Sequence, residues 1–176
     1  KGKYLSNDSF NYLKSLENKS VRIKRDNIDL DRYNRKLRYA IYNDQIINIE
    51  ILQKGLATSF MADGLIYQQK IINSEKYARV NQIGLWKRSV NECAECIKLN
   101  KLERTEEYFI LENICTYDCN LKDWTVKDDA NHFINLISIK ANEKEKFESK
   151  TKIWNDSHDR FFLRDSSGLL VIFYEY

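Results

Sequence analysis

The pattern of apolar residues changes near residues 88–98, and this change constrains the fold more than any other feature of the sequence. Before it, apolar residues recur at helical spacing in three segments and alternate with polar residues in two others. After it, short β-type runs follow one another at close intervals. A chain of 176 residues is long enough for two small domains. We therefore predict an α+β domain over residues 1–90 and an all-β domain over residues 91–176.

Three helices and two strands are predicted in the first half. The helices are expected over residues 7–18, 47–55 and 67–82, and the strands over residues 20–24 and 37–41. Asn7 or Asp8 offers an N-cap for the first helix, and Gly55 closes the second. Asn43-Asp44 is typical of a turn. Gly84 is expected to end the third helix, so that Trp86 packs back onto the core.

The second half contains six short β-type runs with turn residues between them. The runs are Glu107–Leu111, Trp124–Val126, Phe133–Ile139, Lys152–Trp154, Arg160–Leu163 and Leu169–Tyr176. Asp165–Gly168 is typical of a hairpin turn. Six strands with regular punctuation favour an antiparallel β-sandwich, with Trp124 and Leu163 in its core. His132 and His158 are the only histidines, and we expect both in surface loops.

Charge is divided between the two halves. Residues 1–92 carry 17 Lys+Arg and 10 Asp+Glu, a balance of +7, whereas residues 93–176 carry 12 and 16, a balance of −4. A basic half favours phosphate backbones, although a solvated Lys-rich surface gives the same balance. The 11 Tyr, 8 Phe and 3 Trp exclude a disordered chain. No run approaches the roughly 18 apolar residues of a membrane span, so we expect a soluble protein.

The segment Asp31-Arg-Tyr-Asn-Arg-Lys-Leu-Arg-Tyr39 carries the first family resemblance. It resembles the D-x-Y-x-R-x-L-x-Y signature of staphylococcal-nuclease-like (thermonuclease) domains. The later segments Asn48–Ala57 and Gly84–Trp86 keep that family's order, so the resemblance covers residues 1–88. It implies a five-stranded OB-type barrel with helices, and calcium-dependent cleavage of phosphodiester bonds in DNA and RNA.

The resemblance also assigns site residues. Arg35 matches the family's second catalytic arginine, and a planar guanidinium suits bidentate contact with a phosphate. Tyr33 matches the nucleotide-contacting tyrosine, and we expect Lys24 and Arg32 to bind substrate beside it. Asn34 replaces the usual glycine, and Asn tolerates a left-handed conformation. A basic and aromatic hairpin can equally be a solvated strand pair.

Several residues of that family's site have no match in this sequence. Its first arginine, catalytic glutamate and acidic calcium ligands lie on strands before the first helix, whereas Lys3-Tyr4 already resembles the segment after them. We expect a partial barrel that is a poor nuclease alone. Unpaired strand edges recruit partners. The missing strands are therefore expected from another polypeptide, from a swapped copy or from an upstream portion of the same polypeptide.

A second resemblance covers residues 103–176. Glu107–Asn113, the segment Leu121–Asp128 and the segment Trp154–Gly168 resemble the E-Y-V-x-L-x-N, D-L-x-x-W-x-L-x-D and W-N-x-x-x-D-x-x-x-L-x-D-x-x-G patterns of lamin-tail domains. That family is an immunoglobulin-like β-sandwich. In prokaryotes it is often appended to secreted or surface nucleases and hydrolases. The resemblance implies a binding module without catalytic residues.

Four cysteines flank the first predicted strand of the second half. Cys93-x-x-Cys96 and Cys115-x-x-x-Cys119 have a spacing that fits a structural zinc site of four thiolates. Two disulfides are the alternative if the protein is exported, and reduced buried cysteines are the third. Zinc would place the protein in the cytoplasm. We give zinc first place among the three.

Together these features predict the larger part of a thermonuclease-like phosphodiesterase, followed by a lamin-tail-like sandwich. The alternative is a non-catalytic nucleic-acid-binding or scaffold module that has kept the fold and lost the chemistry. DNA or RNA is the expected partner in both cases.

Overall fold

The computed structural model describes residues 4–31, 34–59, 64–130 and 132–176. The chain divides into two compact units, Lys1–Lys87 and Arg88–Tyr176. None of the helices in these ranges is long and apolar enough to cross a membrane.

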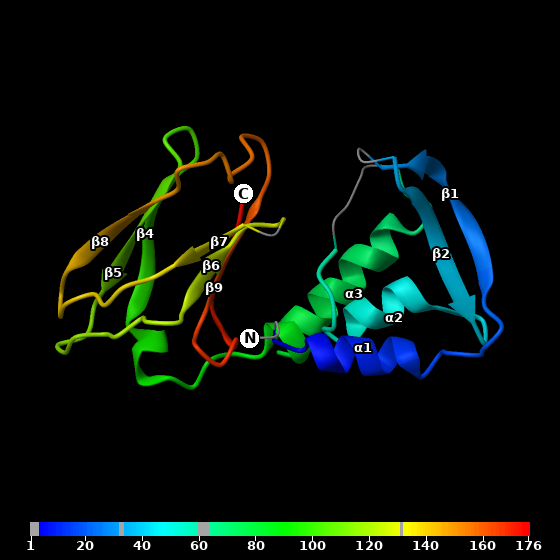
Figure 1. Ribbon diagram of the computed structural model, residues 1–176, viewed down its shortest axis with the longest axis horizontal. Helices are drawn as coiled ribbons and strands as arrows, with labels where there is room; N and C mark the ends of the chain where they lie inside the picture. Colours follow the sequence, from blue (N-terminus) through cyan, green and yellow to red (C-terminus); the bar gives the residue numbers. More distant parts are fainter. Residues whose placement is uncertain (1–3, 32–33, 60–63, 131) are drawn as a thin grey trace. The chain divides into compact units, whose positions relative to one another are not determined.

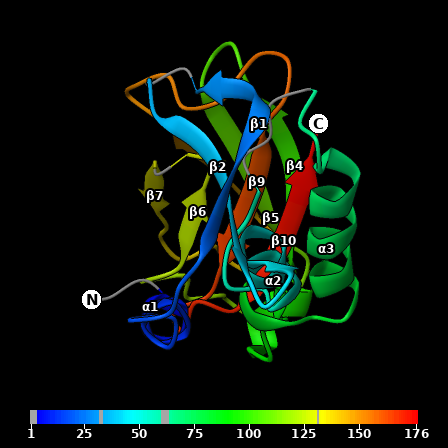
Figure 2. The same cartoon turned by 90° about the vertical axis from the view of Figure 1, so that its right-hand side faces the viewer.

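The first unit combines helices with one small antiparallel sheet. Its elements are α1 (Ser6–Lys14), β1 (Arg22–Leu30), β2 (Lys36–Tyr42), β3 (Gln45–Ile46), α2 (Ile47–Gln53), α3 (Gln68–Val80) and a 3₁₀ turn at Gly84–Trp86. The strand order is β1-β2-β3. Figures 1 and 2 show the long β1–β2 hairpin, with α2 packed on β2 and on α3. In the described part of the chain this sheet is open and does not close into a barrel.

The core of this unit lies between β2, α2 and α3. Tyr39, Leu52 and Ile71 are buried together, and Trp86 is only 1% exposed. The backbones at Gly55 and Gly84 approach closely, since the Leu85 N–H donates to the Gly55 carbonyl at 2.8 Å. This approach fixes the chain after α2 against the chain after α3.

The three predicted helices of the first unit are present, but α1 ends at Lys14 instead of Asn18 and its predicted cap is wrong. The N-cap residue is Leu5, with a φ of 58° and no side-chain cap, and Asn7 and Asp8 lie inside the helix. The first strand is longer than predicted, because it continues to Leu30. The predicted turn at Asn43-Asp44 is confirmed by φ angles of 47° and 60°.

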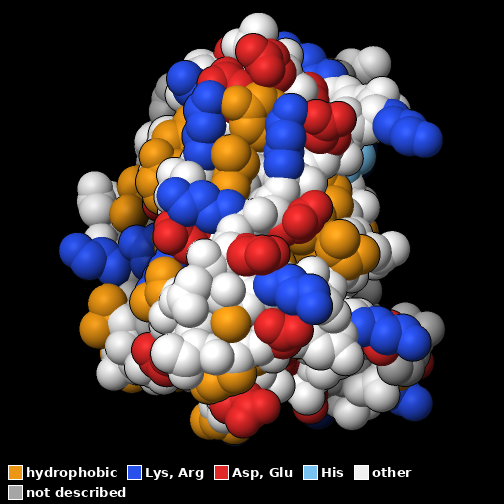
Figure 3. Space-filling model, turned by 90° about the vertical axis from the view of Figure 1, so that its left-hand side faces the viewer, with side chains coloured by type: hydrophobic (Ala, Val, Ile, Leu, Met, Phe, Trp, Pro, Cys, Tyr) orange, Lys and Arg blue, Asp and Glu red, His pale blue; other side chains and the backbone are white. Residues whose placement is uncertain are grey.

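The second unit is built from two antiparallel sheets. Its strands are β4 (Ile97–Glu103), β5 (Tyr108–Asn113), β6 (Thr125–Lys127), β7 (Phe133–Asn135), β8 (Lys144–Glu148), β9 (Arg160–Arg164) and β10 (Leu170–Glu175), after a 3₁₀ turn at Glu92–Glu95. One sheet has the order β10-β9-β6-β7 and the other β4-β5-β8. Figure 3 shows a face of the molecule on which positive and negative side chains are interspersed. On the three-stranded sheet, Lys146 pairs with Glu148 and Lys144 with Glu112.

Both sheets contribute to one apolar core. The rings of Phe109 on β5 and Phe161 on β9 lie 5.2 Å apart, which joins the two sheets directly. Trp154 packs on both rings. The predicted core positions Trp124 and Leu163 are confirmed at 1% and 0% exposed. The predicted hairpin turn is also confirmed, because Asp165 accepts hydrogen bonds from the N–H groups of Ser167 and Leu169.

Two strands of the second unit were missed and one predicted strand is absent. Residues 152–154 are not a strand, although Ile153 and Trp154 are buried. The missed strand β4 contains a register shift between Leu99 and Lys101 that breaks its alternation. The missed strand β8 buries a single apolar residue, Phe147, among lysines and glutamates.

The cysteines form disulfides, so the zinc prediction is wrong. Cys93 pairs with Cys119 and Cys96 with Cys115, with Cα–Cα distances of 5.7 and 5.3 Å that suit a disulfide. The two bridges tie the 3₁₀ turn at Glu92–Glu95 to the loop before β6. Within the described ranges, no group of three or more His, Cys, Asp or Glu residues is arranged to hold a metal ion.

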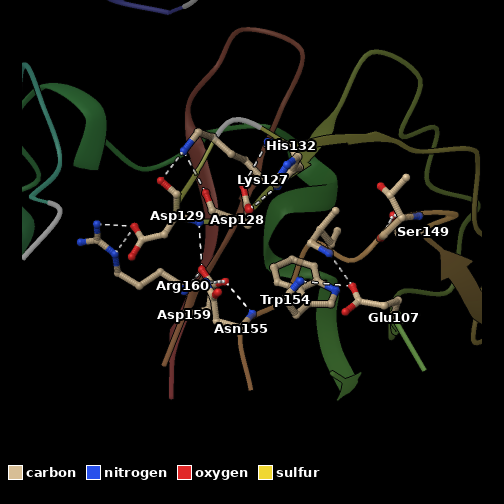
Figure 4. A network of polar contacts seen from close by, with 12 residues as sticks. Glu107, Lys127, Asp128, Asp129, His132, Ser149, Trp154, Asn155, Asp159 and Arg160 are labelled. Carbon is tan, nitrogen blue, oxygen red and sulfur yellow. Dashed lines mark hydrogen bonds and ion pairs between the residues drawn. The ribbon is translucent and has the colours of Figure 1, made fainter. Parts of the chain in front are cut away.

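A buried polar network holds the loops at one end of the second unit (Figure 4). Asp159 is fully buried and accepts a hydrogen bond from the Asn155 side-chain amide at 2.7 Å. Arg160 pairs with Asp129 in a salt bridge whose side chains are 5% and 10% exposed. His132 is 50% exposed and its Nδ1 lies 2.6 Å from Asp128 Oδ2. The Asn and Asp of the W-N-x-x-x-D pattern therefore bond to each other.

Candidate nucleic-acid interface

The turn of the β1–β2 hairpin holds Arg35 through Asp31. Asp31 Oδ1 accepts the backbone N–H of Arg35 at 2.9 Å, and Asp31 Oδ2 accepts Arg35 Nε at 2.6 Å. Asn34 between them has a φ of 60°, the left-handed conformation that glycine or asparagine adopts most readily. The Arg35 side chain is 71% exposed. Its guanidinium is thus oriented by the turn while most of its surface faces solvent.

A second cluster of charges lies along the hairpin. Asp29 Oδ1 lies 2.7 Å from Arg38 Nη1 and 3.2 Å from Arg25 Nε. The hydrogen bond from Arg38 and the charge of Arg25 hold the pKa of Asp29 below its usual value. Asp29 therefore stays ionised and organises the two arginines.

Lys24 on β1 contacts an aromatic residue at the start of α3. Its Nζ donates to the Tyr67 hydroxyl at 2.9 Å and lies 4.8 Å from the centre of the ring. Lys70 Nζ lies 5.5 Å from the same ring. Tyr67 packs edge-on against the buried Tyr39 at 4.8 Å. Two ammonium groups thus gather around one partly exposed ring, an arrangement that suits a phosphate backbone with stacked bases.

Asp26 is buried beneath this cluster and connects β1 to the segment before α3. Its Oδ1 accepts the N–H groups of Asn27 and Ile66 at 2.6 and 3.2 Å. Burial alone raises the pKa of Asp26, but the neighbouring Tyr39 hydroxyl and these N–H groups outweigh it and lower the pKa. Burial and then the bond with Asp26 raise the pKa of Tyr39 to about 12. Asp26 and Tyr39 are both shielded from solvent, so we assign this pair a structural role.

The predicted substrate-binding residues are only partly placed. Arg32 and Tyr33 lie outside the described residues. Arg35 and Lys24 belong to the same hairpin but lie at different ends of it. Arg35 precedes Lys36, which pairs with Leu30 at the turn, whereas Lys24 pairs with Tyr39 and lies six residues before Leu30. At ~3.3 Å per residue this separates them by roughly 20 Å along the strand.

Sequence reasoning missed two residues of this surface. Tyr67 and Lys70 belong to no motif. Tyr67 contacts Lys24 of the hairpin, and Lys70 contacts the ring of Tyr67 three residues before it. A helical stripe at Ile71, Glu75 and Ala78 does predict the buried face of α3. It cannot show that Tyr67, just before this helix, meets Lys24 on β1.

The described residues do not fit a calcium site, although the family that the hairpin resembles uses calcium. Calcium takes six to eight oxygen ligands, with several carboxylates close together. The hairpin carboxylates are separately engaged: Asp26 is buried against N–H groups, Asp29 pairs with two arginines and Asp31 holds Arg35. The buried Glu75 is bonded to Ser59. No catalytic step through calcium is therefore assigned to these residues.

The first unit thus combines an open sheet with helices and presents an oriented, exposed arginine at a hairpin turn. Residues 4–88 match the family described as staphylococcal nuclease homologue. These residues form a staphylococcal-nuclease-like domain, which indicates a nuclease-type function on nucleic acid. The match ends at residue 88, so the lamin-tail resemblance of residues 103–176 stays a prediction. A search of curated proteins gave no match.

Proposed function

We propose that the first unit binds the phosphate backbone of single-stranded DNA or RNA through the β1–β2 hairpin and is the larger part of a thermonuclease-like phosphodiesterase. The observation that carries this proposal is Arg35, an exposed guanidinium oriented by Asp31. By sequence resemblance Arg35 matches the family's second catalytic arginine. Such a group binds phosphoryl oxygens and stabilises the negative charge that develops on them during cleavage.

The surface near Tyr67 supports the same proposal. Lys24 and Lys70 supply two positive charges close to one aromatic ring. Ring stacking and cation contacts are the usual means of holding single strands without sequence preference. The single-stranded nucleic acid would then run along the hairpin from Tyr67 towards Arg35.

The test is binding of fluorescent oligothymidylate to the whole chain at several salt concentrations. Arg35→Ala is expected to weaken binding and to reduce the slope of log K against log salt by about 0.7, the value of one lost phosphate contact on a single strand. Arg22→Ala is the matched control, because Arg22 is equally exposed at 71% and pairs with Asp44 away from the Arg35 turn. Equal slopes for the two variants would refute the assignment of Arg35.

A non-catalytic binding module is the second candidate function. It is favoured by the separate engagement of the hairpin carboxylates, which leaves no calcium ligand set among the described residues. Digestion of single-stranded DNA with added calcium, lost in Arg35→Ala, would support the enzyme. Binding that persists without cleavage, also after a polypeptide carrying the family's first barrel strands is added, would support the binding module.

The outer edge of β1 supports the proposal that further strands complete an OB-type barrel. Val21, Ile23 and Leu30 are 38%, 57% and 44% exposed. In α1, Phe10 and Leu13 are 60% and 51% exposed. Exposed edges with apolar side chains recruit additional strands. Ile23→Lys is expected to abolish binding of such a strand-bearing polypeptide, as measured by sedimentation, and unchanged binding would contradict the proposal.

For the second unit we propose an immunoglobulin-like sandwich of the lamin-tail type that serves as an interaction module. Its two sheets share one core, and the Asn155–Asp159 bond accounts for part of the motif. We also propose an exported location, because disulfides persist in oxidising compartments. A free-thiol count on protein isolated under alkylating conditions tests this location, and four free thiols would contradict it.

A further inference from the structure

The edge strands of the two sheets in the second unit flank a cleft. It has a volume of about 650 Å³ and is lined by residues of β4 and β10 and by the segment before β4. β4 is the outer strand of one sheet and β10 the outer strand of the other. In the described part of the chain, no strand pairs with the outer edge of β4.

The cleft is apolar where it meets the core. Leu99, Leu102 and Ile172 line it and are partly buried against the core cluster of this unit. Ile97 also lines it and is 1% exposed. Partly buried apolar side chains beside backbone edges are the surface that an added β-strand uses, with alternate side chains in the pocket and main-chain hydrogen bonds along the edge.

The charged side chains that line the cleft indicate what kind of partner it binds. Arg88, Lys98, Lys101 and Glu95 line the cleft. Lys101 is paired with Glu103 at 3.5 Å, so Arg88 and Lys98 are set against the one remaining carboxylate, Glu95. This local excess of positive charge contrasts with the unit as a whole, since residues 88–176 carry 13 Lys+Arg and 17 Asp+Glu. Among the described residues, Lys98 has no ion-pair partner. A cleft of opposite sign to its own unit favours an acidic partner.

The segment at residues 88–89 already uses the cleft in this way. The Ser89 N–H donates to the Leu170 carbonyl at 2.9 Å, and Arg88 forms an isolated parallel bridge with Leu170. Arg88 Nη1 donates to the Val171 carbonyl at 2.9 Å. The chain's own backbone thus adds to the beginning of β10, and the remainder of that strand lies beyond it.

We propose that this cleft binds an extended acidic peptide segment of another protein by strand addition. A second copy of the chain is disfavoured, because a symmetric contact would bring the Lys98 side of one copy against that of the other. The register shifts within β4 and β10 also oppose pairing between edges of equal shape. A nucleic acid would use the cations but not the apolar lining or the strand edge.

The test is fluorescence anisotropy with the whole chain and labelled peptides of seven residues, the length of β4. One peptide alternates aspartate with valine and another alternates lysine with valine. A third repeats the first with methyl groups on alternate backbone nitrogens, which removes main-chain donors. We expect saturable binding of the first peptide alone, and a loss of about tenfold or more on methylation.

Matched variants assign the site. Lys98→Glu is expected to weaken binding of the acidic peptide about tenfold. Lys122→Glu changes the charge equally at an exposed lysine that does not line the cleft, and is expected to bind as the unchanged protein does. Thermal unfolding of both variants checks that they fold. Since Lys98 and Arg35 lie in different units, oligothymidylate binding is expected to survive Lys98→Glu.

Four results would overturn the proposal. These are equal binding of the acidic and basic peptides, equal loss in the two lysine variants, competition by oligothymidylate for the peptide, and concentration-dependent dimerisation that Lys98→Glu abolishes. The last result would assign the cleft to a second copy of the chain.

Discussion

Replacing Asp159 with asparagine is expected to destabilise the second unit strongly, because this carboxylate is buried and bonded on both oxygens. Its Oδ1 accepts the backbone N–H groups of Asp129 and Arg160 at 2.9 and 2.8 Å. Its Oδ2 accepts the backbone N–H and the side-chain amide of Asn155 at 3.0 and 2.7 Å. Asparagine keeps the shape of the side chain but replaces one of these acceptors with a donor.

The expected magnitude follows from the bonds that are lost. Whichever way the new amide is turned, its NH₂ group faces two N–H donors that have lost their acceptor. A buried unsatisfied donor costs about 1–3 kcal/mol, so Asp159→Asn is expected to lower the free energy of unfolding by about 2–5 kcal/mol. At 4–8 °C per kcal/mol for a domain of this size, the melting temperature falls by roughly 10 °C or more.

Asp156→Asn is the matched control for this substitution. Asp156 is 71% exposed and pairs with Lys152, which is 64% exposed. An exposed pair of this kind contributes about 0–1 kcal/mol. Calorimetry of the whole chain resolves the transition of the second unit, and hydrogen exchange of β6 and β9 assigns it. If the melting temperatures of the two variants differ by less than ~2 °C, which corresponds to about 0.5 kcal/mol or less, this account of the Asp159 network is refuted.

Three further predictions concern the rest of the molecule. Reduction of the two disulfides, which close loops with sequence separations of 26 and 19, is expected to lower the stability of the second unit by about 3 kcal/mol or more; an unchanged melting curve in reductant would contradict it. Gly55→Ala is expected to destabilise the first unit far more than Gly64→Ala, since both have positive φ but only at Gly55 would the new Cβ meet a backbone atom, Ile83 O, at 2.1 Å; equal urea midpoints would refute this. Because the pKa of Asp26 is lowered in the fold, its contribution to stability is complete above its unfolded pKa of about 3.9 and is lost as the pH falls through the lower folded pKa. Asp26→Asn is expected to flatten that acid limb of stability against pH, as followed by hydrogen exchange of the β2 amides.

The elements that the sequence predicted well are those with strong local patterns. The stripe at Ile71, Glu75 and Ala78 is buried as its spacing requires. The alternation at Tyr39 and Ile41 is likewise buried on one side of β2. In each case one face of a single element meets the core, so the pattern carries the whole signal.

The strands that escaped prediction lack such a pattern for a physical reason. In β8, Lys144 and Lys146 take part in ion pairs on the outer face of the sheet, and Phe147 alone is buried. In β4, the register shift at Asn100 moves the alternation by one residue. The opposite error occurred at Ile153 and Trp154, whose burial is real but whose N–H groups donate to the Glu107 carboxylate instead of a neighbouring strand.

The cysteines show a limit of a different kind. The spacing of the two cysteine pairs is compatible with a zinc site and with two disulfides, because both arrangements require the four sulfur atoms to lie close together. Only the three-dimensional pairing of Cys93 with Cys119 and of Cys96 with Cys115 distinguishes them. Spacing therefore predicted that the cysteines meet, and left their chemistry open.

The hairpin aspartates explain why a sequence with many carboxylates need not contain a metal site. A carboxylate that is already engaged by donors or by a cation is a poorer ligand for a metal ion, and each of these three is engaged at one oxygen or both. Asp26 accepts N–H groups in the interior, Asp29 is shared by two arginines, and Asp31 orients Arg35. The same engagement that removes them as calcium ligands fixes the arginines in place. The hairpin is therefore organised to present positive charge to an anion, and any carboxylates needed to hold a metal beside that anion must come from other residues.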